Sequence, residues 1–179
     1  MVDVRASINN DKVTPTPIAA RCGEEWKYAA VGQEHRRAVV AALIELAASD
    51  DWQDRADAGR ALASFAEMPE SQEPLLHLVL DVDNVFVTRV TAEALLARKD
   101  LAGFTIVAQA LASADDQHGY YIDDAVNAVF MMFASERDQA MEACGALALD
   151  ASAPVRQGAA ELRGVLAAIE PLLYPQDPA

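Results

Sequence analysis

Residues 81–97, DVDNVFVTRVTAEALLA, and residues 149–165, LDASAPVRQGAAELRGV, share an arrangement that decides the fold. In each stretch an aspartate precedes an arginine, and alanine and leucine follow the arginine at the three- and four-residue spacing of an α-helix. Residues 49–65, SDDWQDRADAGRALASF, show the same arrangement. The chain therefore contains a repeated unit in which an acidic turn leads into a helix.

The period of the repeat is given by its three arginines, which are Arg55, Arg89 and Arg156. The first two are 34 residues apart, and the last two are 67 residues apart, which is about two further steps. A fourth copy at 114–130, ADDQHGYYIDDAVNAVF, falls where this period predicts it. In that copy Asp123 or Asp124 stands in the place of the arginine.

Further helical stretches separate these copies. Each carries apolar residues at positions i, i+3, i+4 and i+7, which is the pattern of a helix with one buried face. The chain thus reads as four helical hairpins, helix A and then helix B, with no sustained alternation that would predict a strand. Because a two-helix unit cannot bury its apolar face alone, such units stack side by side. The predicted A helices lie in residues 33–49, 71–82, 100–113 and 135–149.

The stretches NVFVTRVTAEAL (84–95) and APVRQGAAEL (153–162) resemble HEAT repeats of the bacterial short type. The resemblance covers roughly residues 33–170. It implies an all-α fold, a right-handed α-α solenoid of about four hairpins whose B helices line the concave face. It also implies a structural ladder between the turn aspartates and the helix-B arginines, with a gap at the third repeat. The ladder residues would be Asp51 (or Asp50), Arg55, Asp83, Arg89, Asp150 and Arg156.

The two ends differ from this repeat domain. Residues 1–32 have no helical periodicity in their first part and predict a flexible arm. Within them EEWKYAAV (24–31) predicts a short capping helix that docks Trp26 and Tyr28 over the first repeat. Residues 171–179 form a proline-containing tail.

The charge of the chain indicates the kind of partner. The net charge is −14, and residues 1–32 contribute nothing to it because their four acids and four bases cancel. A repeat domain this acidic argues against direct binding to nucleic acid or to an anionic membrane, and it favours a basic protein partner. We expect a monomer or a weak oligomer.

Several absences favour a cytoplasmic protein. The N-terminus lacks the apolar core of a secretory signal, and no run approaches 18 uninterrupted apolar residues. The two cysteines, Cys22 and Cys144, are expected to be reduced, and two cysteines alone do not make a metal site.

The segment DDQHGYYIDD (115–124) gathers four carboxylates, one histidine and two tyrosines. Read alone, it suggests a metal site or an acid–base pair. However, it lacks the calcium-loop pattern, and one histidine among carboxylates is weak support for zinc. Asp115 and Asp116 instead fit the turn position, where an aspartate caps the following helix. We therefore predict no catalytic residue, no metal and no cofactor.

The apolar run VFMMFA (129–134) follows on the same predicted helix. Five consecutive apolar residues cover the whole circumference of a helix, so the run is either a helix packed on most sides or an exposed interaction patch. The second interpretation places a partner-binding surface on the third helix B. Its predicted residues are Tyr120, Tyr121, Asp123, Asp124, Asn127 and Met131.

The sequence therefore predicts a non-enzymatic module that binds a basic protein on its concave helix-B face. One form of this is an inhibitor or immunity-type protein that masks a nucleic-acid-binding toxin or effector. The alternatives are an accessory enzyme and a scaffold subunit of a larger assembly. HEAT-like families include DNA glycosylases and bilin lyases, but the missing basic groove argues against the first, and no cofactor pocket is evident for the second.

Overall fold

The computed structural model describes residues 18–174, with side chains from Gly32 onward. The described chain is all-α and contains no strand. It divides into two units, Met1–Arg37 and Ala38–Ala179. Its helices are α1 (Ile18–Ala47), α2 (Trp52–Ala63), α3 (Pro69–Val79), α4 (Val85–Ala97), α5 (Leu101–Leu111), α6 (Asp116–Phe130), α7 (Ala134–Leu147) and α8 (Ala153–Ala168).

The predictions for the N-terminal residues can be compared with the structure only within the described range. Residues 24–31 belong to the continuous helix α1 and do not form a separate short helix. The predicted arm at residues 1–17, the docking of Trp26 and Tyr28, and the end of the tail at 175–179 lie outside the described residues and side chains.

Helix starts follow the polar residues that precede them. Asp51 caps α2, Asn84 caps α4, Asp100 caps α5 and Asp115 caps α6, each accepting a hydrogen bond from a main-chain N–H of the first turn. Such a cap satisfies a donor that the helix leaves unpaired and contributes about 1 kcal/mol. The acidic turns predicted from the repeat are therefore helix caps.

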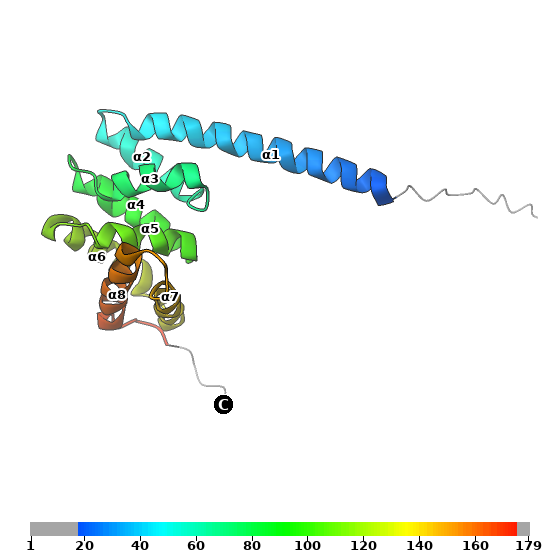
Figure 1. The fold of residues 1–179 in the computed structure, drawn as a ribbon. Helices are drawn as coiled ribbons and strands as arrows, with labels where there is room; N and C mark the ends of the chain where they lie inside the picture. The colour runs from blue at the N-terminus through cyan, green and yellow to red at the C-terminus, as the bar shows by residue number, and fades with distance from the viewer. Residues whose placement is uncertain (1–17, 175–179) are drawn as a thin grey trace, which may run out of the picture. The chain divides into compact units, whose positions relative to one another are not determined.

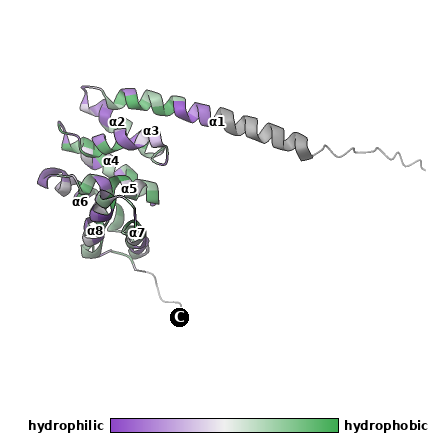
Figure 2. Cartoon of the chain, viewed as in Figure 1, coloured by the Kyte–Doolittle hydropathy of each residue, from purple (hydrophilic) through white to green (hydrophobic). Residues whose placement is uncertain are grey.

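The helices of the second unit share one continuous hydrophobic core (Figure 1). Helix α4 packs between α2 and α6, and α3 packs against α2, α4 and α5. Hydrophobic residues predominate along α5 (Figure 2). The largest fully buried side chains include Phe104 of α5 and Phe130 of α6, whose rings stack 6.2 Å apart. The last residues of α1 join the core through Val40.

The last two helices, α7 and α8, pack differently from the preceding ones. Helix α8 lies mainly against α5 and α7 and has few contacts with α6. In Figure 1 both α7 and α8 run steeply across the direction of α5. Gly158 permits this crossing, because a Cβ at that position would overlap the main-chain carbonyl of Ala108. The packing of α2 on α4 and of α4 on α6 is therefore not continued by α8, which packs mainly on α5.

The predicted helix through VFMMFA is wrong. Helix α6 ends at Phe130, and Met131 is its C-cap. The tail supplies the reason, because main-chain N–H groups of Leu172 and Leu173 donate to the carbonyls of Met131 and Met132, and Ala134 N–H donates to the carbonyl of Leu173. These bonds engage main-chain groups around residues 131–134 in place of helical bonds.

Candidate functional site

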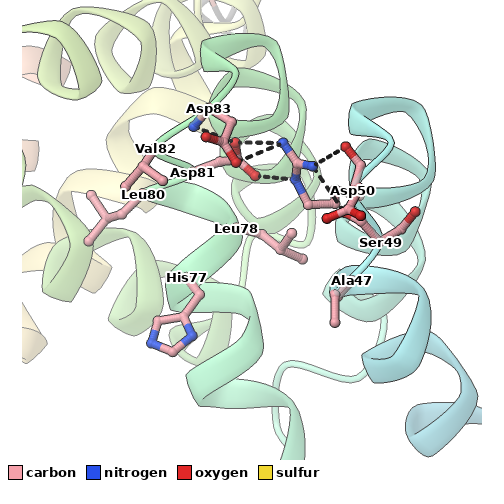
Figure 3. Close-up of a pocket in the computed structure, with 11 residues that line it drawn as sticks. Ala47, Ser49, Asp50, His77, Leu78, Leu80, Asp81, Val82 and Asp83 are labelled. Carbon is pink, nitrogen blue, oxygen red and sulfur yellow. Dashed lines mark hydrogen bonds and ion pairs between the residues drawn. The ribbon is translucent and has the colours of Figure 1, made fainter.

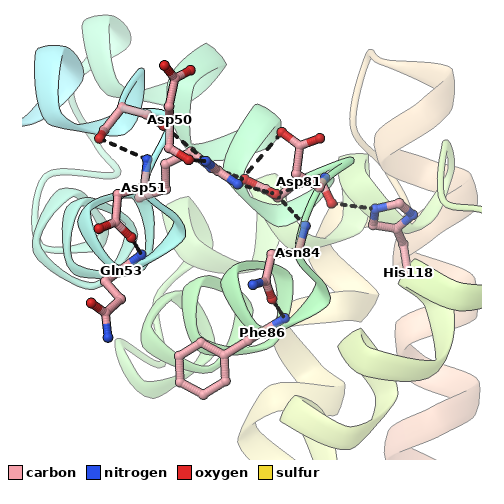
Figure 4. A network of polar contacts seen from close by, with 10 residues as sticks. Asp50, Asp51, Gln53, Asp81, Asn84, Phe86 and His118 are labelled. Carbon is pink, nitrogen blue, oxygen red and sulfur yellow. Dashed lines mark hydrogen bonds and ion pairs between the residues drawn. The ribbon is translucent and has the colours of Figure 1, made fainter.

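The turns that lead into α2 and α4 are joined by a buried ion pair. Arg55 Nε donates to Asp81 Oδ2 at 2.6 Å, and Arg55 Nη2 donates to Asp81 Oδ1 at 3.1 Å (Figure 4). Arg55 Nη1 also donates to the carbonyls of Ser49 and Asp50, each at 3.0 Å. The hydrogen bond that Arg55 donates to Asp81 raises the pKa of Arg55 against the opposing effect of burial. Arg55 therefore links the turn before α2 to the turn before α4.

This pair corrects the predicted ladder. The acceptor of Arg55 is Asp81, whereas Asp83 is exposed and lies 3.8 Å from Arg55 Nη2. Asp51 does not pair with Arg55, because its carboxylate accepts the main-chain N–H of Gln53 as the cap of α2. The turn DVDN (81–84) contains two aspartates, and the spacing of the repeat indicates Asp83. The structure shows that the aspartate hydrogen-bonded to Arg55 is Asp81.

Arg89 departs from the ladder because α4 begins one residue early. The cap Asn84 lies five residues before Arg89, whereas Asp51 lies four residues before Arg55. One residue rotates a side chain by about 100° around a helix, so Thr88 takes the buried position and Arg89 turns outward. Arg89 Nε then donates to Asp124 Oδ2 at 2.5 Å, which fills the predicted gap in the third repeat.

The fourth repeat has a simpler arrangement. Arg156 Nη1 donates to the main-chain carbonyls of Asp150 and Ala151 at 2.8 and 2.9 Å. Those carbonyls correspond to the ones that Arg55 holds in the first repeat. The predicted pairing of Arg156 with Asp150 thus involves the main chain of Asp150 and not its carboxylate.

His118 takes part in the same row of turns. Its Nδ1 lies 2.6 Å from Asp115 Oδ1. Its Nε2 lies 3.1 Å from the carbonyl oxygen of Asp81 (Figure 4). Burial lowers the pKa of His118, but the contacts with the Asp81 carbonyl and with Asp115 outweigh it, so the pKa is raised. The same histidine lowers the pKa of Asp115, chiefly through its main-chain N–H.

An open cavity of about 390 Å³ lies between the first two of these turns (Figure 3). Its polar wall includes Asp50, His77 and the Arg55–Asp81 pair, whose charges satisfy one another. In the part of the chain with described side chains, no group of three or more His, Cys, Asp or Glu residues is arranged to hold a metal ion. The DDQHGYYIDD segment is the cap and first turns of α6.

The predicted partner-binding residues of α6 have different environments. Tyr120 is 67% exposed, while Tyr121 is half-buried and meets it edge-on with ring centroids 5.3 Å apart. Asp124 is held by Arg89. Asn127 Nδ2 donates to the carbonyl of Asp123 one turn earlier. Among the large hydrophobic side chains of this group, Tyr120 is therefore the most exposed.

Two of these residues have surroundings that the sequence did not predict. Burial raises the pKa of Asp123, and the nearby carboxylate of Glu161 on α8 raises it further. Met131 follows the end of α6, and its side chain is 44% exposed. It belongs to an exposed apolar group, which we call the C-terminal apolar cluster and which comprises Met131, Met132, Phe133, Leu172, Leu173 and Tyr174.

Two aromatic residues that the sequence analysis missed stand on the first turns of α2 and α4. Trp52 is 40% exposed and Phe86 is 39% exposed, and their rings meet edge-on with centroids 5.3 Å apart. The guanidinium of Arg60 lies over the Phe86 ring, 5.6 Å from its centroid. Their position in the sequence could have indicated exposure. Each ring lies within two residues of a helix cap, where apolar side chains are not needed for the core.

A shallow groove of about 310 Å³ begins beside this aromatic pair and runs along α4. Phe86, Val90, Ala94 and Ala97 make its apolar floor at helical spacing, and Arg60 and Arg89 stand at its sides. The charges of the two arginines are compensated by carboxylates, Asp57 for Arg60, and Asp124 together with the groove residue Glu93 for Arg89. The groove therefore has an apolar floor and no uncompensated positive charge along its sides.

A scan of protein-family models finds no match to this chain, and searches of curated proteins and of solved structures find none either. None of the helices in the described range combines the length and apolar character that crossing a membrane requires.

Proposed function

We propose that the chain is a non-enzymatic protein-binding module built as a right-handed solenoid of about four HEAT-like hairpins. The pairs α1–α2, α3–α4, α5–α6 and α7–α8 would be the hairpins, and α2, α4 and α6 would be successive B helices. The packing of α4 between α2 and α6 supports this order. The crossing of α8 over α5 would make the fourth hairpin an end unit, which repeat proteins need to close their core.

The observation that carries the proposal is a set of exposed aromatic side chains on the first turns of three B helices. Trp52 on α2 contacts Phe86 on α4, and Tyr120 stands near the start of α6. Large aromatic side chains and arginine are the residues that most often dominate binding energy in protein interfaces. Because these three side chains are exposed, they are available as binding anchors, and we assign this surface to partner binding.

The charge beside these rings favours a basic partner. Five exposed carboxylates stand on the same turns and first helical residues, and Arg60, the base over the Phe86 ring, is paired with Asp57. Arg55 is buried, and His118 is turned toward Asp81. An incoming basic protein would meet negative charge at the rim and aromatic surface beside it. An inhibitor that masks a nucleic-acid-binding effector would need such an acidic surface, because the effector's own binding surface is basic. The carboxylates are those of Asp50, Asp51, Asp83, Asp115 and Asp116.

Site-specific photo-crosslinking in the native cell tests the proposal. A photoreactive phenylalanine analogue placed at position 52 or 120 should capture a protein of basic character. The same analogue at Leu101, which is exposed on the first residue of α5, is the matched control and should not capture it. Equal capture at all three positions, or capture of an acidic protein, would count against this surface.

Affinity measurements with the captured partner give the second test. Trp52→Ala, Phe86→Ala and Tyr120→Ala should each weaken binding roughly 10-fold or more, as truncation of interface anchors does. Leu101→Ala should change the dissociation constant by less than about 2-fold, as expected of a residue outside the interface. If the three aromatic variants bind as well as the unmodified chain, the proposal is wrong.

A further inference from the structure

His118 lies between two oxygen atoms that come from different parts of the chain. On one side is the carboxylate of Asp115, which caps the helix to which His118 itself belongs. On the other side is the main-chain carbonyl of Asp81, 37 residues earlier, in the turn before α4. The imidazole thus joins the first turn of α6 to that turn.

Both of these oxygens accept hydrogen bonds and neither donates one. An ionised carboxylate and a main-chain carbonyl are acceptors only. A neutral imidazole has one N–H and one lone pair, so it would satisfy one oxygen and turn a lone pair toward the other. An imidazolium has two N–H donors and satisfies both. This arrangement of two acceptors therefore favours the protonated ring.

We propose that His118 is a pH-operated clasp, which when protonated ties α6 to the turn before α4 and when neutral loses one of its two hydrogen bonds. The row Arg55, Asp81, His118 and Asp115 would then connect three successive turns only while the imidazole carries its charge. This proposal concerns the repeat packing and does not depend on the proposed partner.

The charges around the imidazole favour its protonated form. Asp115 contacts it directly, and the carboxylate of Asp81 lies beside it, although that carboxylate is held by Arg55. Asp83 lines the same cavity of about 360 Å³ as His118, and Asp116 is exposed at the start of α6. These neighbours are acids apart from Arg55, which faces Asp81.

The direction of the pH effect follows from the raised pKa of His118. Because the folded chain binds the proton more tightly than the unfolded chain, protonation contributes stability that is fully present below the ordinary value of 6.5. That contribution disappears as pH rises through the folded value. The change would be local, because α4 and α6 also pack along their lengths.

Nitrogen-15 NMR of the histidine rings in the full chain tests the clasp directly. At pH 6.5 we expect both ring nitrogens of His118 to show the shifts of a mostly protonated imidazolium, with a titration midpoint above 6.5. A His118 midpoint at or below 6.5, or a neutral tautomer at that pH, would overturn the proposal. This measurement needs no substitution, so it does not depend on whether a variant folds.

A pair of variants tests the coupling to stability. His118→Gln should flatten the fall in unfolding free energy that the unmodified chain shows between pH 6 and pH 9. His77→Gln, which changes an exposed histidine of α3, is the matched control and should leave that fall unchanged. If His118→Gln keeps the full pH dependence, His118 is not the group that confers it, and the clasp is refuted.

Discussion

Arg55 and Asp81 are 26 residues apart in the chain, yet two hydrogen bonds join their side chains and fasten the turn before α2 to the turn before α4. Both side chains are nearly buried, at 10% and 7% exposure. Asp81 also accepts the main-chain N–H groups of Asp83 and Asn84, so one carboxylate organises the whole turn. This relationship sets the register between the first two repeats.

Removing the Asp81 carboxylate should destabilise the chain strongly. Asp81→Ala leaves the Arg55 guanidinium buried without its partner and two main-chain donors without their acceptor, so we expect a loss of about 2–4 kcal/mol in the free energy of unfolding. Asp83→Ala, two residues away and exposed, should cost less than about 0.5 kcal/mol. Urea unfolding of the two variants checks this, and equal losses would contradict the assignment of Asp81.

The crossing of α8 over α5 makes a prediction about two glycines of the same helix. Gly158→Ala places a methyl group against the carbonyl of Ala108 and should lower the free energy of unfolding by about 1–3 kcal/mol. Gly164→Ala adds a methyl group in open space and should raise it by up to about 1 kcal/mol, because alanine favours the helix. Thermal unfolding should therefore shift in opposite directions for the two variants.

Cys144 should be unreactive in the folded chain. It is buried in α7, and desolvation raises the pKa of its thiol to about 11, so little thiolate exists near neutral pH. In a Cys22→Ser background, which leaves one thiol, the reaction with a disulfide reagent at pH 8 should be slow and should accelerate greatly in denaturant. Rapid modification of the native chain would show that α7 opens readily.

Asp123 should destabilise the fold when it is ionised. Burial and the nearby Glu161 raise its pKa above the ordinary value of 3.8, so the folded chain binds this proton more tightly than the unfolded chain does. Asp123→Asn should therefore raise the free energy of unfolding at pH 7, by less than about 1 kcal/mol because the group is partly exposed. The gain should vanish as pH falls below the ordinary value.

Asp116→Asn is the matched control for that substitution. Asp116 is the first residue of α6, where negative charge is favoured by the helix dipole, so its neutralisation should lower stability slightly at pH 7. Opposite signs for the two variants in denaturant unfolding would support the assignment. A loss of stability for Asp123→Asn would contradict it.

The all-α character and the approximate positions of the helices were predictable from local signals. Apolar residues at helical spacing located α3, α5 and α7 to within a few residues, whereas α1 begins at Ile18, well before the predicted start at residue 33. Asp51, Asp100 and Asp115 precede helices and cap them. These signals act over a few residues, which is the range that a single sequence displays directly.

The details of the turns were not predictable in the same way. The choice between Asp81 and Asp83 depended on where α4 begins, and a shift of one residue there moved Arg89 out of the ladder and onto Asp124. No local pattern reports such a shift, because Thr88 and Arg89 both fit a helix. The end of α6 at Phe130 likewise depended on a tail that lies 40 residues later in the chain.

That tail has a consequence for the order in which the native structure forms. The α6–α7 connection depends on main-chain bonds to Leu172 and Leu173, so it cannot reach its final state until those residues have left the ribosome. The contacts of α2 with α4 need only the first hundred or so residues. During synthesis, the contacts between α2 and α4 can therefore form early. The exposed residues Met131, Met132 and Phe133 reach their final conformation only after the tail has been synthesised.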